Sequence, residues 1–301
     1  MECLAVFNTI VSNCIKKFGG IKHDKIAMKW LSRMFLAVFL VLLAVFLYDV
    51  CFKIIPYEIK HAPSYFSIFW RMVLVIYLTY TVLFHYFQCM LKEPIVVPKF
   101  EGQRRRICKL CNVVKCKLTH HCSNCEKCIY KMDHHCPWIG QCVGAHNQVN
   151  FISFLIFMSI GCIAFFTLGA TFWTNHFQVI SERGIVRTLL DCDQSVPSVV
   201  KFNPFVFMFV CEKNHFGFEV TVLAMTMLFV FATTFIFSLI QVKKICLEQF
   251  FVKDTLEKSE RLTLELLVFR WRRYFGLRDE ESFLTAFLVP NNREPFQYYE
   301  L

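Results

Sequence analysis

Four apolar segments, each about as long as a membrane-crossing helix, divide this chain of 301 residues. They cover residues 34–50, 68–90, 151–173 and 220–240. A helix needs about 20 apolar residues to cross the hydrocarbon core of a bilayer. Four buried helices of a soluble core are the alternative, but the length and continuity of these segments disfavour it. The sequence therefore predicts an all-α polytopic membrane protein with four transmembrane helices.

Charge indicates which parts of the chain face the cytosol. Lysines and arginines concentrate in the N-terminal segment, the central segment and the tail, and few lie in the two remaining loops. Because cytosolic segments carry the excess of positive charge, we expect both termini and the central segment to be cytosolic. Arg71, near one end of the second apolar segment, is expected to reach the interface.

These signals predict five regions. No cleavage pattern precedes the first apolar segment, so we expect it to be retained. Residues 262–275 form a basic amphipathic pattern that is typical of a helix on a membrane surface. The predicted regions are a cytosolic N-terminal segment (1–33), transmembrane helices 1 and 2 with a short lumenal loop (34–91), a cytosolic cysteine-rich domain (92–150), transmembrane helices 3 and 4 with a lumenal loop at 175–216 (151–242), and a cytosolic tail (243–301).

The central segment carries an unusual density of metal-binding side chains. Residues 108–142 contain eight cysteines and four histidines. In the reducing cytosol such a cluster binds metal or performs catalysis rather than forming disulfides. The Cys-x-x-Cys pairs Cys108/Cys111 and Cys122/Cys125 each place two thiolates on one tight turn, as tetrahedral zinc requires. We therefore expect two structural zinc ions, with one zinc and several reduced cysteines as the alternative.

Spacing alone leaves the assignment of ligands open. Two tetrahedral zinc ions use about eight ligands, fewer than the candidates present. Either His134 or His135 could be a ligand, and either Cys136 or Cys142 could be left over. A cysteine left over beside a histidine and an aspartate is available as a nucleophile.

The order of these residues resembles that of a known family. The pattern is Cys-x2-Cys-x9-His-Cys-x2-Cys-x2-Cys-x4-Asp-His-His-Cys-x5-Cys, which begins at Cys108 and ends at Cys142 and includes Pro137 and Trp138. It is similar to the cysteine-rich domain of the DHHC protein acyltransferases, which are integral-membrane S-palmitoyltransferases. The resemblance covers about residues 93–151, and the four-helix layout around this segment is also that of the family.

The resemblance implies a role for each residue of the cluster. Cys136 is the expected nucleophile, His134 its base and Asp133 the group that orients His134. Two structural zinc sites are implied, one formed by Cys108, Cys111, His121 and Cys128 and the other by Cys122, Cys125, His135 and Cys142.

The implied reaction transfers a palmitoyl group from palmitoyl-CoA to cysteines of membrane-associated proteins, through an acyl-enzyme on Cys136. The implied location is the endoplasmic reticulum or Golgi membrane, and no nucleic-acid partner is expected. Arg104, Arg105 and Arg106 are expected to meet the coenzyme A phosphates or anionic lipid headgroups. The family's Thr-Thr-x-Glu motif matches residues 254–257, which implies supporting roles for Thr255 and Glu257.

The chain departs from the family pattern in several places. Cys116 and Leu118 stand where the family has a proline and an arginine, and Gln141 stands where it has an asparagine. Arg270 occupies a position near Phe275 where an asparagine is usual. The alternatives to a palmitoyltransferase are a catalytically silent zinc-bearing membrane scaffold and a membrane-anchored RING-type ubiquitin ligase. The retained catalytic residues argue against the scaffold, and the ligand order does not fit a RING.

Overall fold

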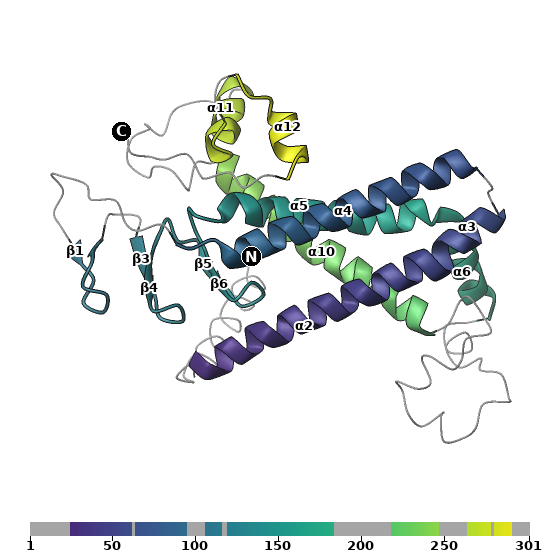
Figure 1. Ribbon diagram of the computed structural model, residues 1–301, viewed down its shortest axis with the longest axis horizontal. Coiled ribbons are helices and arrows are strands. Elements are labelled where there is room, and N and C mark those ends of the chain that lie inside the picture. Colours follow the sequence, from purple (N-terminus) through teal and green to yellow (C-terminus); the bar gives the residue numbers. More distant parts are fainter. Residues whose placement is uncertain are drawn as a thin grey trace, which may run out of the picture. The chain divides into compact units, whose positions relative to one another are not determined.

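The computed structural model describes residues 25–61, 64–94, 106–115, 119–183, 218–246, 264–277 and 280–290 (Figure 1). These residues are mostly helical, and the Cys/His-rich segment lies between the second and third long helices, which confirms the predicted fold class. The chain divides into two compact units, Met1–Phe39 with Pro94–Ala145 and Leu40–Glu93 with His146–Leu301.

In the described part of the chain, four helices are long and apolar enough to cross a membrane: Trp30–His61, Tyr65–Leu91, Gln148–Leu168 and Val220–Cys246. Each contains most of one of the predicted apolar segments. The helical elements are α2 (Lys25–Asp49), a π-helical turn η1 (Val50–Ile54), α3 (Ile55–His61), α4 (Tyr65–Leu91), α5 (Gln148–Leu168), α6 (Ala170–Arg183), α10 (Phe218–Cys246), α11 (Leu264–Tyr274) and α12 (Phe283–Leu288).

The third apolar segment, 151–173, is divided between two helices. Helix α5 stops at Leu168, and α6 begins after Gly169 and continues into the predicted lumenal loop. A Cβ atom at Gly169 would lie 2.7 Å from Cγ2 of Ile54 and 3.1 Å from Nε1 of Trp173. The Trp173 indole donates a hydrogen bond to the carbonyl of Phe165 across the break. The missing side chain therefore lets the chain turn against its neighbours, a tertiary contact that apolar length does not reveal.

Arg71 has a partner within the second unit. Its guanidinium forms a 3.0 Å ion pair with Glu58 and donates a 2.6 Å hydrogen bond to the carbonyl of Leu168. Glu58 is buried, and its other carboxylate oxygen accepts the backbone N–H of Phe172 at 2.9 Å. The sequence suggests that Arg71 is solvated at the interface, whereas the structure pairs it with an acid. This pair joins α3, α4 and the start of α6.

Helix α5 is central to the second unit. It packs against both α4 and α10. The Ser159 and Thr234 hydroxyls are 2.9 Å apart across the α5–α10 contact. Helix α11 also packs on these helices: Arg270 donates to the carbonyl of Cys246, and the Tyr274 hydroxyl donates to the carbonyl of Gln148 at 3.0 Å. The helix predicted for 262–275 is therefore present, but one of its faces lies against protein.

The described residues of the first unit form three antiparallel hairpins. Their strands are β1 (Arg106–Ile107) with β2 (Val114–Lys115), β3 (Thr119–Cys122) with β4 (Lys127–Tyr130), and β5 (His134–Cys136) with β6 (Gln141–Val143). Each sheet has only two strands. Isolated two-stranded hairpins are marginally stable in water. Something other than strand pairing must therefore hold this segment together.

We expect Glu58→Ala to destabilise the protein by roughly 1–3 kcal/mol, because the variant leaves Arg71 partly buried without its acid. Thermal unfolding of the protein in lipid nanodiscs measures the effect. The double variant Glu58→Ala, Arg71→Met should recover part of the loss, since the uncompensated charge is then removed. Glu265→Gln, at an exposed position on α11, is the control. Equal stability of Glu58→Ala and wild type would contradict this account of the ion pair.

Candidate metal centres and catalytic site

The first Cys/His cluster is assembled by the β3–β4 hairpin and the turn before it. The strand register places His121 opposite Cys128. The His121 Nδ1 atom lies 3.1 Å from the Cys111 sulfur, 3.7 Å from that of Cys108 and 3.9 Å from that of Cys128. All four ligand atoms lie within 4.8 Å of one another. The cluster offers three sulfur atoms and one imidazole nitrogen.

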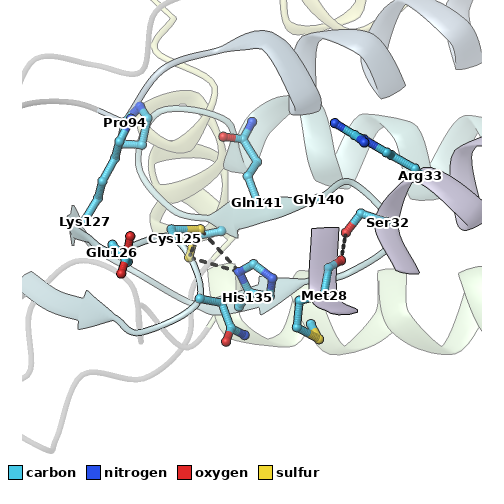
Figure 2. Close-up of a pocket in the computed structure, with 12 residues that line it drawn as sticks. Met28, Ser32, Arg33, Pro94, Cys125, Glu126, Lys127, His135, Gly140 and Gln141 are labelled. Atoms are coloured by element: carbon cyan, nitrogen blue, oxygen red, sulfur yellow. Dashed lines mark hydrogen bonds between the residues drawn. The ribbon is translucent and has the colours of Figure 1, made fainter. Parts of the chain in front are cut away.

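The second cluster uses the neighbouring residue of β3. Cys122, Cys125, His135 and Cys142 converge, again within 4.8 Å. The β5–β6 register places His135 opposite Cys142. Figure 2 shows the His135 ring pointing toward Cys125, with its Nδ1 atom 3.4 Å from that sulfur. Because successive side chains of a strand point to opposite faces, His121 and Cys122 contribute to different clusters.

Both clusters suit a tetrahedral metal ion. Three cysteine sulfurs and one histidine nitrogen form a common closed, structural zinc site. Ligand cysteines must be deprotonated to bind metal. The Cys125 thiol has its pKa lowered to about 4 by a hydrogen bond from Cys142, an effect that burial opposes and His135 reinforces. The donor set therefore fits a metal ion at each cluster, and the roles of these eight residues as ligands stay predictions.

The predicted catalytic residues lie at the β5–β6 hairpin. The imidazole Nδ1 atom of His134 is 3.1 Å from a carboxylate oxygen of Asp133. His134 and Cys136 are two residues apart on β5, so their side chains leave the strand on the same face, whereas His135 leaves on the other face, toward the second cluster. Cys136 is buried. Strand β5 thus places His135, a candidate metal ligand, on one face and His134 and Cys136 on the other.

The electrostatics of His134 favour its charged form. Burial lowers the pKa of its imidazole, but hydrogen bonds to Asp133 and Cys136 outweigh burial and raise that pKa to about 9. His134 therefore contacts a carboxylate on one side and the Cys136 side chain on the other.

The beginning of α2 packs on the turn that follows Cys136. The rings of Phe35 and Trp138 stack with centroids 4.0 Å apart. Gly140 has a φ of 70°, and a Cβ atom there would lie 3.3 Å from Cβ of Ser32. This contact between α2 and the catalytic hairpin was not predicted. The three-residue spacing of Ser32 and Phe35 indicates that they share one face of a helix, but it does not indicate what that face contacts.

A pocket of about 360 Å³ lies beside the second cluster within the first unit (Figure 2). Arg33 and Ser32 line it from α2, and Lys127, His135 and Gln141 line it from the hairpins. Cys136 does not line this pocket. The cavity therefore borders a candidate metal centre and not the nucleophile, and we assign it no substrate.

Several predicted residues lie outside the part of the chain that the structure describes. They are Arg104, Arg105, the side chain of Arg106, Cys116, Leu118, Thr255 and Glu257. The backbone of Arg106 pairs with Lys115 in the first hairpin. Gln141, the first residue of β6, pairs with Cys136 of β5. Arg270, which replaces an expected asparagine, is buried and reaches the end of α10. Its structural role was missed because an arginine in a basic helix suggests solvent exposure.

These features define a class: a protein with four helices of membrane-spanning length and a Cys/His-rich, metal-binding segment between the second and third. Residues 101–249 match the family model for the DHHC palmitoyltransferase domain. The chain belongs to the DHHC family, as its Asp133-His134-His135-Cys136 sequence and its cysteine spacing predict.

Curated relatives are similar to this chain over part of its length. Palmitoyltransferase ZDHHC16A of Danio rerio is 28% identical over 160 residues, which are 52% of this chain and 41% of the relative. Palmitoyltransferase pfa3 of Aspergillus fumigatus is 48% identical over 73 residues, 24% of this chain and 13% of the relative. Palmitoyltransferase ZDHHC20-A of Danio rerio is 43% identical over 78 residues, 24% and 21% respectively. The matches span less than half the length of these relatives.

We expect the purified protein to contain about two metal ions per chain, one for each set of four ligands. Elemental analysis measures this. Cys142→Ala should lower the content by about one ion and make the hairpin segment more sensitive to protease, because the metal that closes the second cluster is lost. Cys246→Ala, at the end of α10, is the matched cysteine control and should keep both ions. A metal content unchanged by Cys142→Ala would contradict the assignment of the second cluster.

Proposed function

We propose that this chain is a protein S-palmitoyltransferase that transfers a palmitoyl group from acyl-CoA to cysteines of other proteins. The observation that carries the proposal is the Asp133–His134 pair beside Cys136, on a hairpin that contributes His135 and Cys142 to the second candidate metal cluster. The family match over residues 101–249 supports the same activity.

The first half of the reaction acylates Cys136. His134 holds the Cys136 proton as an imidazolium, and the Cys136 thiolate attacks the thioester carbon of palmitoyl-CoA. A bond forms between the Cys136 sulfur and the acyl carbon, and the bond from that carbon to the coenzyme A sulfur breaks. His134 returns the proton to the departing thiolate, so free coenzyme A leaves. Asp133 holds the imidazole orientation and stabilises the imidazolium throughout.

The second half transfers the acyl group to the substrate protein. A substrate cysteine loses its proton to His134 and attacks the acyl carbon on Cys136. The Cys136 sulfur is the leaving group and recovers the proton. One thioester replaces another in each half, so acyl-CoA is the sole source of energy that the reaction requires.

Zinc is the metal that we assign to the two clusters. Cys108, Cys111, His121 and Cys128 would hold one ion, and Cys122, Cys125, His135 and Cys142 would hold the other. Zinc supplies a closed structural site that takes no part in the chemistry when all four ligands come from the protein. The ligands themselves position β5 and therefore the face that carries His134 and Cys136.

A membrane location suits the acyl donor. Transfer of a fatty chain out of water is favourable by about 0.8 kcal/mol for each methylene. Spanning helices near the reactive cysteine would therefore stabilise the bound chain. We assign Arg104, Arg105 and Arg106 to the coenzyme A phosphates, and Thr255 and Glu257 to support of the hairpin. We further propose that the site faces the cytosol of the endoplasmic reticulum or Golgi, where membrane-associated proteins supply the substrate cysteines.

The decisive experiment incubates the purified protein with an alkyne-tagged palmitoyl-CoA and measures the label retained on the chain. Wild type should carry label that hydroxylamine removes, because an acyl-enzyme is a thioester. Cys136→Ser should carry none, whereas Cys51→Ser, at an exposed cysteine remote in sequence from the cluster, should be labelled like wild type. Wild-type protein without label would favour a silent scaffold, and label unchanged in Cys136→Ser would exclude Cys136 as the nucleophile.

Asp133→Asn should slow acylation by about 100-fold or more, because the neutral amide no longer stabilises the imidazolium or fixes the tautomer. Single-turnover acylation by tagged palmitoyl-CoA measures the rate. The variant should keep its metal content, which separates a chemical defect from unfolding of the hairpins. An acylation rate within twofold of wild type would remove Asp133 from the mechanism.

A further inference from the structure

Helix α12 is apolar on both of its faces. Its inner side chains Phe283, Ala286 and Phe287 pack on α5, α10 and α11 as part of one apolar cluster. On its outer side, Leu284 is 66% exposed, and Val289, the residue that ends the helix, is 57% exposed. Its polar side chain, Thr285, is exposed and donates its hydroxyl to the carbonyl of Ser282 at 3.0 Å, so that hydroxyl is satisfied within the segment. Apolar side chains on both faces of so short a helix are unsuited to water and are typical of a protein core or a membrane. No described residue covers these outer side chains.

Contacts with α5 show how far α12 lies along the axis of that helix. Tyr274 in α11 bonds the carbonyl of Gln148, the first residue of α5, at 3.0 Å. Phe287 in α12 stacks on Phe157, nine residues further along α5, with ring centroids 5.0 Å apart. At 1.5 Å per residue the chain has advanced about 14 Å along the α5 axis between these contacts. Phe157 lies near the middle of this 21-residue helix.

A contact with α4 also places α12 near the middle of a long helix. The Tyr77 hydroxyl donates a 2.6 Å hydrogen bond to the carbonyl of Leu288, the last residue of α12. Tyr77 lies near the middle of the 27-residue helix α4, about 21 Å along the axis from its last residue, Leu91. In Figure 1, the yellow helices α11 and α12 lie beside α5 and α4. Two membrane-spanning helices therefore place the end of α12 near their midpoints.

The polar groups of this segment suit entry from one side of a membrane. Backbone groups in the hydrocarbon core must be satisfied within the protein. The Val289 N–H donates to the Thr285 carbonyl at 3.0 Å, and the Tyr77 hydroxyl satisfies the carbonyl of Leu288. The charged residue Glu280 is exposed and precedes the apolar run. The chain thus changes from polar to apolar as it moves from the end of α5 toward its middle.

We propose that residues 283–289 form a re-entrant segment that dips into the bilayer and places Leu284, Leu288 and Val289 against lipid acyl chains. The inference rests on α4 and α5 crossing the membrane and is independent of the acyl-transfer activity. Its partner is the hydrocarbon of the bilayer. The polar Glu280–Ser282 end lies toward the headgroups, and the apolar end of α12 lies near mid-membrane.

Electron paramagnetic resonance of the full chain in lipid nanodiscs tests the proposal. A spin-labelled amino acid is incorporated by codon suppression at position 284 in place of leucine, which leaves the native cysteines untouched. Position 76 is the hydrocarbon control, because Ile76 is 64% exposed and adjoins Tyr77 on α4. Position 265, exposed on α11, is the control for the level of the helix ends. Collision with dissolved oxygen reports hydrocarbon, and collision with a water-soluble nickel chelate reports water.

The label at 284 should match that at 76, with oxygen collisions several-fold more frequent than nickel-chelate collisions. Nickel collisions at 284 as frequent as at 265 would overturn the proposal, since the segment would then lie in water. Low collision rates with both reagents would also overturn it, because protein would then cover the outer face.

Wild-type protein provides a second measurement that needs no substitution. A lipid-soluble diazirine, activated by light in the nanodiscs, should label the peptide that contains residues 283–289 to an extent similar to the exposed positions of α4. A water-soluble carbene precursor should label it several-fold less. The reverse order of the two reagents would overturn the proposal even if the spin-labelled variant failed to fold.

Discussion

The segment between the second and third long helices depends on the convergence of cysteine and histidine side chains, because its apolar core is small. Its strands are two to four residues long. One buried apolar cluster among its described residues consists of Cys122, Ile129 and Cys142, with two half-buried neighbours. Two of those three residues are themselves members of the second metal cluster. Ligand geometry therefore takes the place of hydrophobic burial, and the register of each hairpin follows from which side chains must meet.

The alternation of side chains along β5 separates the candidate metal ligand from the candidate catalytic residues. His135 points into a cluster, and the residues on either side of it point away on the other face of β5. A metal ion bound at the second cluster would therefore hold the backbone of β5 within one residue of His134 and Cys136 without touching their side chains. The stacking of Phe35 on Trp138 and the close approach at Gly140 hold the following turn from the other direction. Rigid support of this kind is what a nucleophile with a fixed base requires.

The sequence predicted features that depend on local pattern and missed those that depend on tertiary contact. Apolar length located the four long helices, since a membrane span is a property of consecutive residues. Spacing predicted metal binding but could not divide the candidates. The grouping came from the family resemblance, and the structure brings the same residues together. The break at Gly169 and the buried role of Arg270 depend on partners far away in the chain. Helix α12 is six residues long, too short for periodicity to reveal.

The ion pair of Glu58 and Arg71 has a consequence for the order in which the protein is made. Glu58 accepts from Arg71, 13 residues later, and from the backbone of Phe172, 114 residues later. Arg71 in turn bonds the carbonyl of Leu168. During synthesis the first helical hairpin therefore holds an acid and a base whose remaining partners, the Leu168 carbonyl and the Phe172 N–H, arrive only with the end of α5 and the start of α6. The contacts of this ion pair with α5 and α6 therefore form only after the Cys/His segment has left the ribosome.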